Sequence, residues 1–165
     1  GHDLMLKRMK RRHSRAQAIA MVERLKAARP AIAIGADLIA GFPTEDEAAA
    51  EANASLISAC DIVFAHIFPY SPRQGTPAAR MPQLPRALVK QRAAALRAVG
   101  EQHRHRWLSS MVGTRQALLV ERDGLSGHAD NFARIRLTHP AAPGTIISAI
   151  INGLDERGLI GKEAA

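Results

Sequence analysis

The sequence contains one cysteine, Cys60, in 165 residues, and only 4% of its residues are aromatic. A single thiol cannot form an internal disulfide, and zinc or iron–sulfur sites built from a chain's own thiolates need three or four of them. With so few aromatic side chains, a core must be built mainly from Ala, Leu, Ile and Val. Such a core suits helices packed against parallel strands.

Long hydrophobic segments are also absent. No apolar run approaches the ~20 residues that a transmembrane helix needs, and the chain shows neither the charged nor the apolar region of a secretory signal. We therefore expect a cytoplasmic protein that does not enter a membrane. The sequence begins without Met and in the middle of a pattern, which is compatible with a piece of a longer polypeptide.

Acidic residues are in the minority, because 23 Lys or Arg residues against 15 Asp or Glu give a net charge of +8. A protein this basic commonly binds a polyanion, and nucleic acid is the first candidate. A generally basic surface without such a partner is the alternative that composition leaves open.

Two apolar runs stand out in the first half, residues 31–40 and 62–68, and Gly or Pro follows each of them closely. Because helices do not fit so close to these breakers, we predict two buried parallel strands, covered on both faces. Asp37 is the one polar side chain near the end of the first run. A buried carboxylate needs a donor, and either the protein or a ligand at the strand ends could supply it.

Helix signals surround these two runs. Ser14–Gln17 and Thr44–Glu47 both fit the capping-box pattern of a helix start, and residues 84–110 repeat apolar positions with the helical period. Helix and strand alternate along this part of the chain. This order predicts an α/β unit with a parallel sheet over residues 1–110.

The pattern changes after residue 110. Short predicted strands at 117–121, 132–138 and 145–152, with an end near 159–160, are separated by Gly and Pro. This spacing predicts a small all-β, OB-like barrel of about five strands over residues 111–165. Phe132 with the nearby Arg134 and Arg136 is typical of a surface that stacks bases and contacts phosphates, although Phe132 fits a core position equally well.

Several stretches carry a resemblance to a known family: GHDLMLKRMKRRHS, ADLIAGFPTE, FPYSPRQGTPAARMP, and a tail with HADNFARIRL and PGTIISAIINGL. Together they resemble the C-terminal half of the radical S-adenosylmethionine methylthiotransferases. The branch that modifies threonylcarbamoyladenosine in transfer RNA (tRNA) is the most similar. The resemblance implies the last part of a TIM-like radical-enzyme barrel, followed by an RNA-binding TRAM barrel.

The resemblance also implies a chemistry and its cofactors. In this family S-adenosylmethionine and [4Fe–4S] clusters serve to add a methylthio group at C2 of the adenosine beside the anticodon. The chain has no CxxxCxxC motif, so the cluster ligands would lie in a missing N-terminal portion, and we expect the chain alone to be inactive. Two alternatives stay open: the isopentenyladenosine-specific branch, and an RNA-binding module without catalysis.

The resemblance implies site residues for a cofactor and for tRNA, but no catalytic or metal-binding residue. The expected cofactor-binding residues are Asp37, Ile39, Gly41, Phe68 and Tyr70. The expected RNA-binding residues are Arg73, Arg115, Asn131, Arg134 and Arg136.

Overall fold

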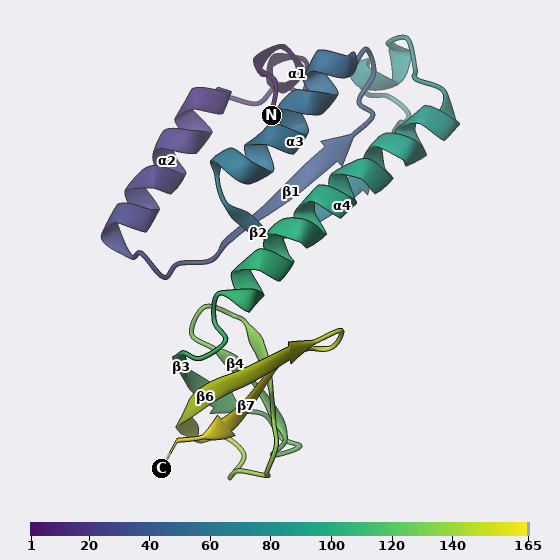
Figure 1. Ribbon diagram of the computed structural model, residues 1–165. Coiled ribbons are helices and arrows are strands. Elements are labelled where there is room, and N and C mark those ends of the chain that lie inside the picture. The colour runs from purple at the N-terminus through teal and green to yellow at the C-terminus, as the bar shows by residue number, and fades with distance from the viewer. Residues whose placement is uncertain (165) are drawn as a thin grey trace. The chain divides into compact units, whose positions relative to one another are not determined.

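The computed structural model describes residues 1–164, which form two compact units (Figure 1). The first unit comprises Gly1–Arg104, and the second begins at His105. The boundary expected from the sequence, after residue 110, falls just beyond the end of helix α4 (Arg86–Ser109), which runs through the boundary between the units. Each unit has its own core, and each is described by itself below.

The first unit is a mixed α/β structure around a two-stranded parallel sheet. Its elements before α4 are α1 (Asp3–Arg8), α2 (Arg15–Ala28), β1 (Ile34–Ala40), α3 (Glu47–Ala59), β2 (Ile62–Pro69) and a 3₁₀ turn (Pro77–Arg80). β1 and β2 pair in parallel, with Asp37 opposite His66 and Ile39 opposite Phe68. The predicted pair of parallel strands joined by a helix is thereby confirmed.

The helices cover one face of this sheet. Leu38 and Ala40 of β1 belong to a core that also contains Ile57 of α3 and Leu96 of α4, with α2 packed against it. Residues at the alternate positions of β1 lie on the other face, where Gly35 and Asp37 are exposed. The expectation that both faces are covered is therefore wrong for the residues described, because α2, α3 and α4 all contribute to the same core.

One of the two predicted helix starts is correct and the other is displaced. Ser14 and Gln17 form both contacts of a capping box at the start of α2. At α3 the N-cap is Asp46, whose carboxylate accepts the N–H of Ala49 at 2.8 Å. Thr44 has a φ of 66°. It belongs to the turn after β1 and does not cap the helix.

The second unit is a closed five-stranded barrel in the order β3-β4-β5-β7-β6, with β6 pairing back to β3. The strands are β3 (Arg115–Val120), β4 (Ser126–Ala129), β5 (Arg134–Leu137), β6 (Ile146–Asp155) and β7 (Gly158–Glu163). All pairs are antiparallel except β5 with β7. Leu118, Ile135 and Ile151 are fully buried inside. The small barrel is confirmed.

Strand β4 was not predicted, because it has only four residues and contains a glycine. Gly127 in β4 lies opposite Val120 of β3. A Cβ atom at Gly127 would lie 2.1 Å from the carbonyl oxygen of Leu119. This close backbone approach explains why glycine, which usually weakens a strand, occupies the position.

We predict that Gly127→Ala destabilises the barrel by about 1–3 kcal/mol, because the added methyl group must displace backbone. Gly153→Ala in β6 is the matched control, since its nearest heavy-atom neighbour would lie at an ordinary 3.8 Å. Urea unfolding followed by Trp107 fluorescence measures both variants. Equal stability of the two variants would contradict the explanation given for Gly127.

Candidate functional site

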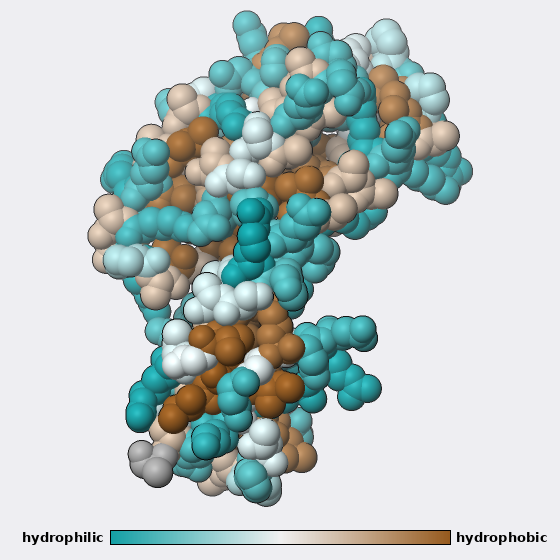
Figure 2. Space-filling model, viewed as in Figure 1, coloured by the Kyte–Doolittle hydropathy of each residue, from teal (hydrophilic) through white to brown (hydrophobic). Residues whose placement is uncertain are grey.

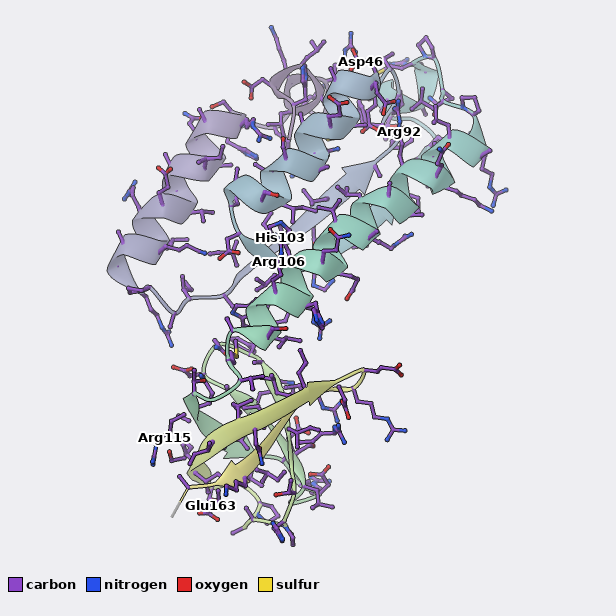
Figure 3. The ribbon with its side chains drawn as sticks, viewed as in Figure 1. Asp46, Arg92, His103, Arg106, Arg115 and Glu163 are labelled. Atoms are coloured by element: carbon purple, nitrogen blue, oxygen red, sulfur yellow. The ribbon has the colours of Figure 1, made fainter. Side chains whose placement is uncertain are left out.

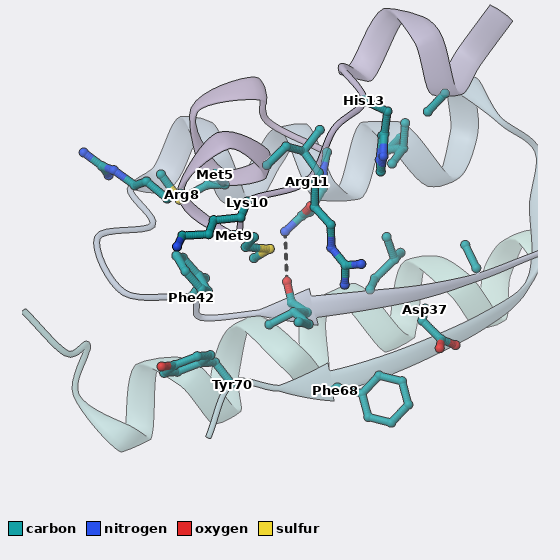
Figure 4. Close-up of a pocket in the computed structure, with 18 of the residues that line it drawn as sticks. Met5, Arg8, Met9, Lys10, Arg11, His13, Asp37, Phe42, Phe68 and Tyr70 are labelled. Carbon is teal, nitrogen blue, oxygen red and sulfur yellow. Dashed lines mark hydrogen bonds between the residues drawn. The ribbon is translucent and has the colours of Figure 1, made fainter. Parts of the chain in front are cut away.

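A cavity of about 970 Å³ lies in the first unit, beside β1 and the carboxyl ends of both strands. Figure 4 shows residues 5–13 on one side of it and β1 and β2 on the other. Apolar side chains supply much of the wall; they include Met5, Met9, Ile39, Phe42, Phe68 and Tyr70. Its size and apolar walls are those of a site for a small molecule or nucleoside.

Four of the five predicted cofactor residues line this cavity. Asp37, Ile39 and Phe68 lie on the face of the sheet away from the helical core, and Tyr70 follows β2. Tyr70 is held by its N–H, which donates to the carbonyl of Ala40 at 2.8 Å, and by an edge contact with Phe42. The structure therefore places these four side chains along one cavity, Asp37 in the middle of β1 and the others nearer the carboxyl ends of the strands.

Asp37 is not the buried carboxylate that the sequence suggested. Asp37 is exposed to solvent, so water can hydrate its carboxylate and no donor from the protein is needed. The reason is the one-sided cover of the sheet, which leaves this position of β1 facing the cavity. Asp37 is also the only carboxylate among the residues that line the cavity.

Gly41, the fifth predicted residue, is buried behind the cavity wall. Its φ is 76°, and a Cβ atom would lie 2.8 Å from the side chain of Val89 in α4. Only glycine fits this turn without strain. Gly41 therefore shapes the end of β1 rather than lining the cavity with a side chain.

A buried acidic residue that the sequence analysis did not single out fixes this turn. Glu45 accepts the N–H of Gly41 at 3.0 Å and pairs with Arg92 of α4 at 3.2 Å, with only 1% of its side chain exposed. Arg92 also donates to the backbone carbonyl of Glu45 at 2.7 Å. Figure 3 shows Arg92 reaching from α4 toward the start of α3, where Asp46 lies. Burial raises the pKa of Glu45, while the Gly41 N–H and Arg92 act in the opposite direction.

The end of α1 and the segment after it bring basic side chains to the cavity. Arg8, Lys10, Arg11 and His13 line it from one side, and Arg73 lines it from the loop after β2. Met5 anchors the segment, because it is buried in a cluster with Phe42. The run of cations between residues 7 and 15 was the signal for this group, but only the fold places part of it at the cavity.

On the barrel, the predicted RNA residues separate into two groups. Arg115, at the start of β3 (Figure 3), and Arg134 of β5 are exposed. Arg136 alternates with buried residues on β5, as Arg134 does, and forms an ion pair with Asp155. Asn131 is buried instead, and its side-chain oxygen accepts the N–H of Ala133 at 3.1 Å. Its side chain serves the turn between β4 and β5.

That turn presents Phe132 to solvent. Phe132 is 74% exposed, so the possibility that it belongs to the core is wrong. Its φ is 64°, a conformation that is rare for a bulky residue. Other large apolar side chains are also exposed in this unit, and Figure 2 shows hydrophobic surface gathered over the barrel. These exposed residues are Val112, Leu119, Leu125 and Ile146.

The fold and the sites define a class: an α/β unit with a basic, apolar-walled cavity at its strand ends, followed in the chain by a small barrel with exposed cations and an exposed aromatic. No family model matches the chain. It is 42% identical over 156 residues, 94% of the chain and 37% of the relative, to threonylcarbamoyladenosine tRNA methylthiotransferase MtaB of Rickettsia prowazekii. It is 38% identical over 169 residues, 98% of the chain and 38% of the relative, to tRNA-2-methylthio-N(6)-dimethylallyladenosine synthase of Cereibacter sphaeroides.

The chain therefore belongs to the radical S-adenosylmethionine tRNA methylthiotransferase family, as its motifs indicated. It spans a little over a third of the length of these curated relatives. Within residues 1–164, none of the helices combines the length and apolar composition needed to cross a membrane. In the same range, no three His, Cys, Asp or Glu side chains are grouped so that they could hold a metal ion.

We predict that Arg92→Leu destabilises the first unit by about 3–5 kcal/mol near neutral pH, because it leaves the buried Glu45 carboxylate unpaired. Removing Arg92 raises the pKa of Glu45 further. A carboxyl group with a raised folded-state pKa contributes most stability below its unfolded pKa, and this contribution is lost as the pH rises through the folded value. The loss of unfolding free energy in the variant should therefore grow as the pH rises from 4.5, the ordinary pKa of a glutamate, toward 7.

Urea unfolding of wild type and variant at several pH values in this range measures the deficit. Arg86→Leu, at the exposed start of the same helix, is the matched control. A deficit of Arg92→Leu that does not change with pH would contradict the role given to Glu45.

Proposed function

We propose that this chain is part of a tRNA methylthiotransferase that adds a methylthio group at C2 of N6-threonylcarbamoyladenosine, beside the anticodon. The observation that carries this proposal is the 42% identity, over 94% of the chain, to a relative named for that activity. The second candidate is the dimethylallyladenosine branch, supported by the 38% identity over nearly the whole chain to a relative of that name. The cations that line the cavity favour the first, because a threonylcarbamoyl group carries a carboxylate.

We infer that β1 and β2 are the last strands of a larger, TIM-like barrel. One face of the sheet packs on α2, α3 and α4, as the outer face of such a barrel does. The other face carries Asp37, Ile39 and Phe68 and would be its interior. The cavity also follows β1 past Ala18 and Val22 of α2, where preceding strands of a longer polypeptide would fit. We also propose that the part belonging to this larger barrel ends near residue 110, where the small RNA-binding β-barrel begins.

The cavity fits the nucleoside part of S-adenosylmethionine. Ile39, Phe68 and Tyr70 offer apolar surface for an adenine ring, and Asp37, which lines the same cavity, would accept a hydrogen bond from an amino or hydroxyl group. Bound S-adenosylmethionine would supply the radical and the methyl group of the reaction. Gly41 would act through the backbone, since Glu45 fixes the turn that it forms. The one cysteine of the sequence cannot hold the [4Fe–4S] clusters, so their ligands would come from outside these residues.

We propose that the barrel binds tRNA, the partner of this reaction, which would take place in the cytoplasm. Arg115, Arg134 and Arg136 would contact phosphates, and Phe132 would stack on a base. The strained backbone of Phe132 supports this role, because a ring that is 74% exposed gains little packing to offset the strain. Arg73 would contact RNA at the mouth of the cavity. A binding module without catalysis would need only these contacts.

The proposal predicts that a longer polypeptide that includes this chain, produced anaerobically with its clusters, converts N6-threonylcarbamoyladenosine in tRNA to its 2-methylthio form. Mass spectrometry of digested tRNA measures the product. Conversion of isopentenyladenosine instead would assign the chain to the second candidate. Binding of tRNA without either product would leave only a binding module.

For the barrel, we predict that Arg134→Gln makes the negative slope of log affinity for tRNA against log salt concentration less steep by about 1. Phe132→Asn should weaken binding by about 1–3 kcal/mol without changing the slope, because Asn tolerates the left-handed turn but cannot stack as an aromatic ring does. Lys90→Gln on the exposed face of α4 is the charge-matched control. Filter binding at several salt concentrations measures all three, and slopes that do not differ between Arg134→Gln and Lys90→Gln would exclude the phosphate contact.

A further inference from the structure

We propose that Arg11, with Lys10 beside it, binds a carboxylate carried by an adenine nucleoside in the cavity. This inference rests on the proposed function and deepens it, because it names the group that the basic side of the cavity recognises. The carboxylate has two possible sources, the amino-acid part of S-adenosylmethionine and the threonyl part of the modified adenosine. Both place a carboxylate on an adenine nucleoside.

The turn after α1 directs Arg11 into the cavity. The N–H of Arg11 donates to the carbonyl of Leu6 at 2.9 Å, and that of Lys10 to the carbonyl of Lys7 at 3.0 Å. These two bonds form a Schellman motif, in which the residue at the position of Lys10 is usually glycine. Lys10 occupies it with a φ of 57°. Figure 4 shows the Arg11 side chain extending from this turn toward β1, while the Asp37 side chain projects from the other side of that strand.

The charges around the cavity do not balance. Arg8, Lys10, Arg11 and Arg73 line it together with one carboxylate, Asp37. Within residues 1–164, the side chains of Lys10 and Arg11 have no hydrogen-bonding or ion-pair partner. The Arg73 side chain likewise makes no such contact in this range, because only its backbone carbonyl is bonded. By contrast, the guanidinium of Arg15 donates to the carbonyl of Ala52 and the hydroxyl of Ser55, and Arg8 donates to the hydroxyl of Thr44. Three cations thus remain for a ligand.

The surroundings favour a carboxylate on a nucleoside over an RNA phosphate for Arg11. Its side chain lines a cavity that Ile39 and Met9 also line, so an anion there would be joined to an apolar or aromatic group. A guanidinium presents two parallel donors that match a carboxylate. Arg11 and Arg12 are both exposed, but only Arg11 lines the cavity. Arg12 therefore shares the charge and exposure of its neighbour but not its position at the cavity.

The test compares acids with matched neutral ligands on the 165-residue chain by isothermal titration calorimetry. One arm pairs S-adenosylmethionine with 5′-methylthioadenosine, which lacks the amino-acid part. The other pairs N6-threonylcarbamoyladenosine with its threonine methyl ester. The proteins are wild type, Arg11→Gln, Arg11→Lys and, as matched control, Arg12→Gln. Circular dichroism confirms that each variant is folded.

We expect Arg11→Gln to weaken binding of the acid in one arm by at least about tenfold, the loss of one charge-assisted hydrogen bond. Arg11→Gln should change the affinity for the neutral ligand by less than about threefold, and Arg12→Gln should change the affinity for either ligand by no more than that. Arg11→Lys should restore part of the loss. The arm in which the acid is affected identifies the source of the carboxylate. Equal losses for acid and neutral ligand, no loss in either arm, or no binding of any nucleoside would each overturn the inference.

The outcomes separate this inference from the proposed function. If acids and neutral ligands bind alike while the longer polypeptide still forms 2-methylthio-threonylcarbamoyladenosine, the carboxylate site is wrong and the function stands. If no methylthio product forms but the Arg11-dependent preference for an acid remains, the site stands without that function.

Discussion

The geometry of the cavity depends on one buried contact, between the Glu45 carboxylate, the N–H of Gly41 and the guanidinium of Arg92. Gly41 directly follows β1, Glu45 precedes α3, and Arg92 comes from α4. A charge buried this deeply costs several kcal/mol without its partner, so these three segments cannot move apart independently. The bond from Tyr70 to Ala40 then fixes the end of β2 to the end of β1. Both turns at the carboxyl edge are thereby held in place.

One-sided packing determines what this fixed edge can present. Two strands alone are marginally stable in water, so the apolar burial comes from helices packed against them. Because α2, α3 and α4 all contribute to one core, the alternate side chains of β1 and β2 are left on the face away from these helices. Asp37, Ile39 and Phe68 lie on that face, and all three line the cavity. The same alternation on β5 leaves Arg134 exposed while Ile135 is fully buried.

The sequence was sufficient where local signals decide the structure. Breakers beside apolar runs predicted β1 and β2, and the Ser14 capping box predicted the start of α2. Contacts between distant residues could not be predicted in this way. The partner of Glu45 lies 47 residues further along the chain, so nothing near Glu45 distinguished it from an acidic residue in the first turn of a helix. The exposure of Asp37 depends on which face the helices cover, and β4 depends on a backbone approach at Gly127.

Backbone strain occurs both in turns whose side chains bond within the protein and in turns whose side chains do not. Four non-glycine residues described here have positive φ: Lys10, Thr44, Asp61 and Phe132. Each such conformation costs roughly 1–2 kcal/mol. Thr44 accepts from Arg8 and Asp61 pairs with Lys26, so contacts within the protein offset part of the cost. The side chains of Lys10 and Phe132 make no such contact within the described residues, yet one lines the cavity and the other projects from the barrel. Strain that stability alone would remove is retained where an anion and a base would bind.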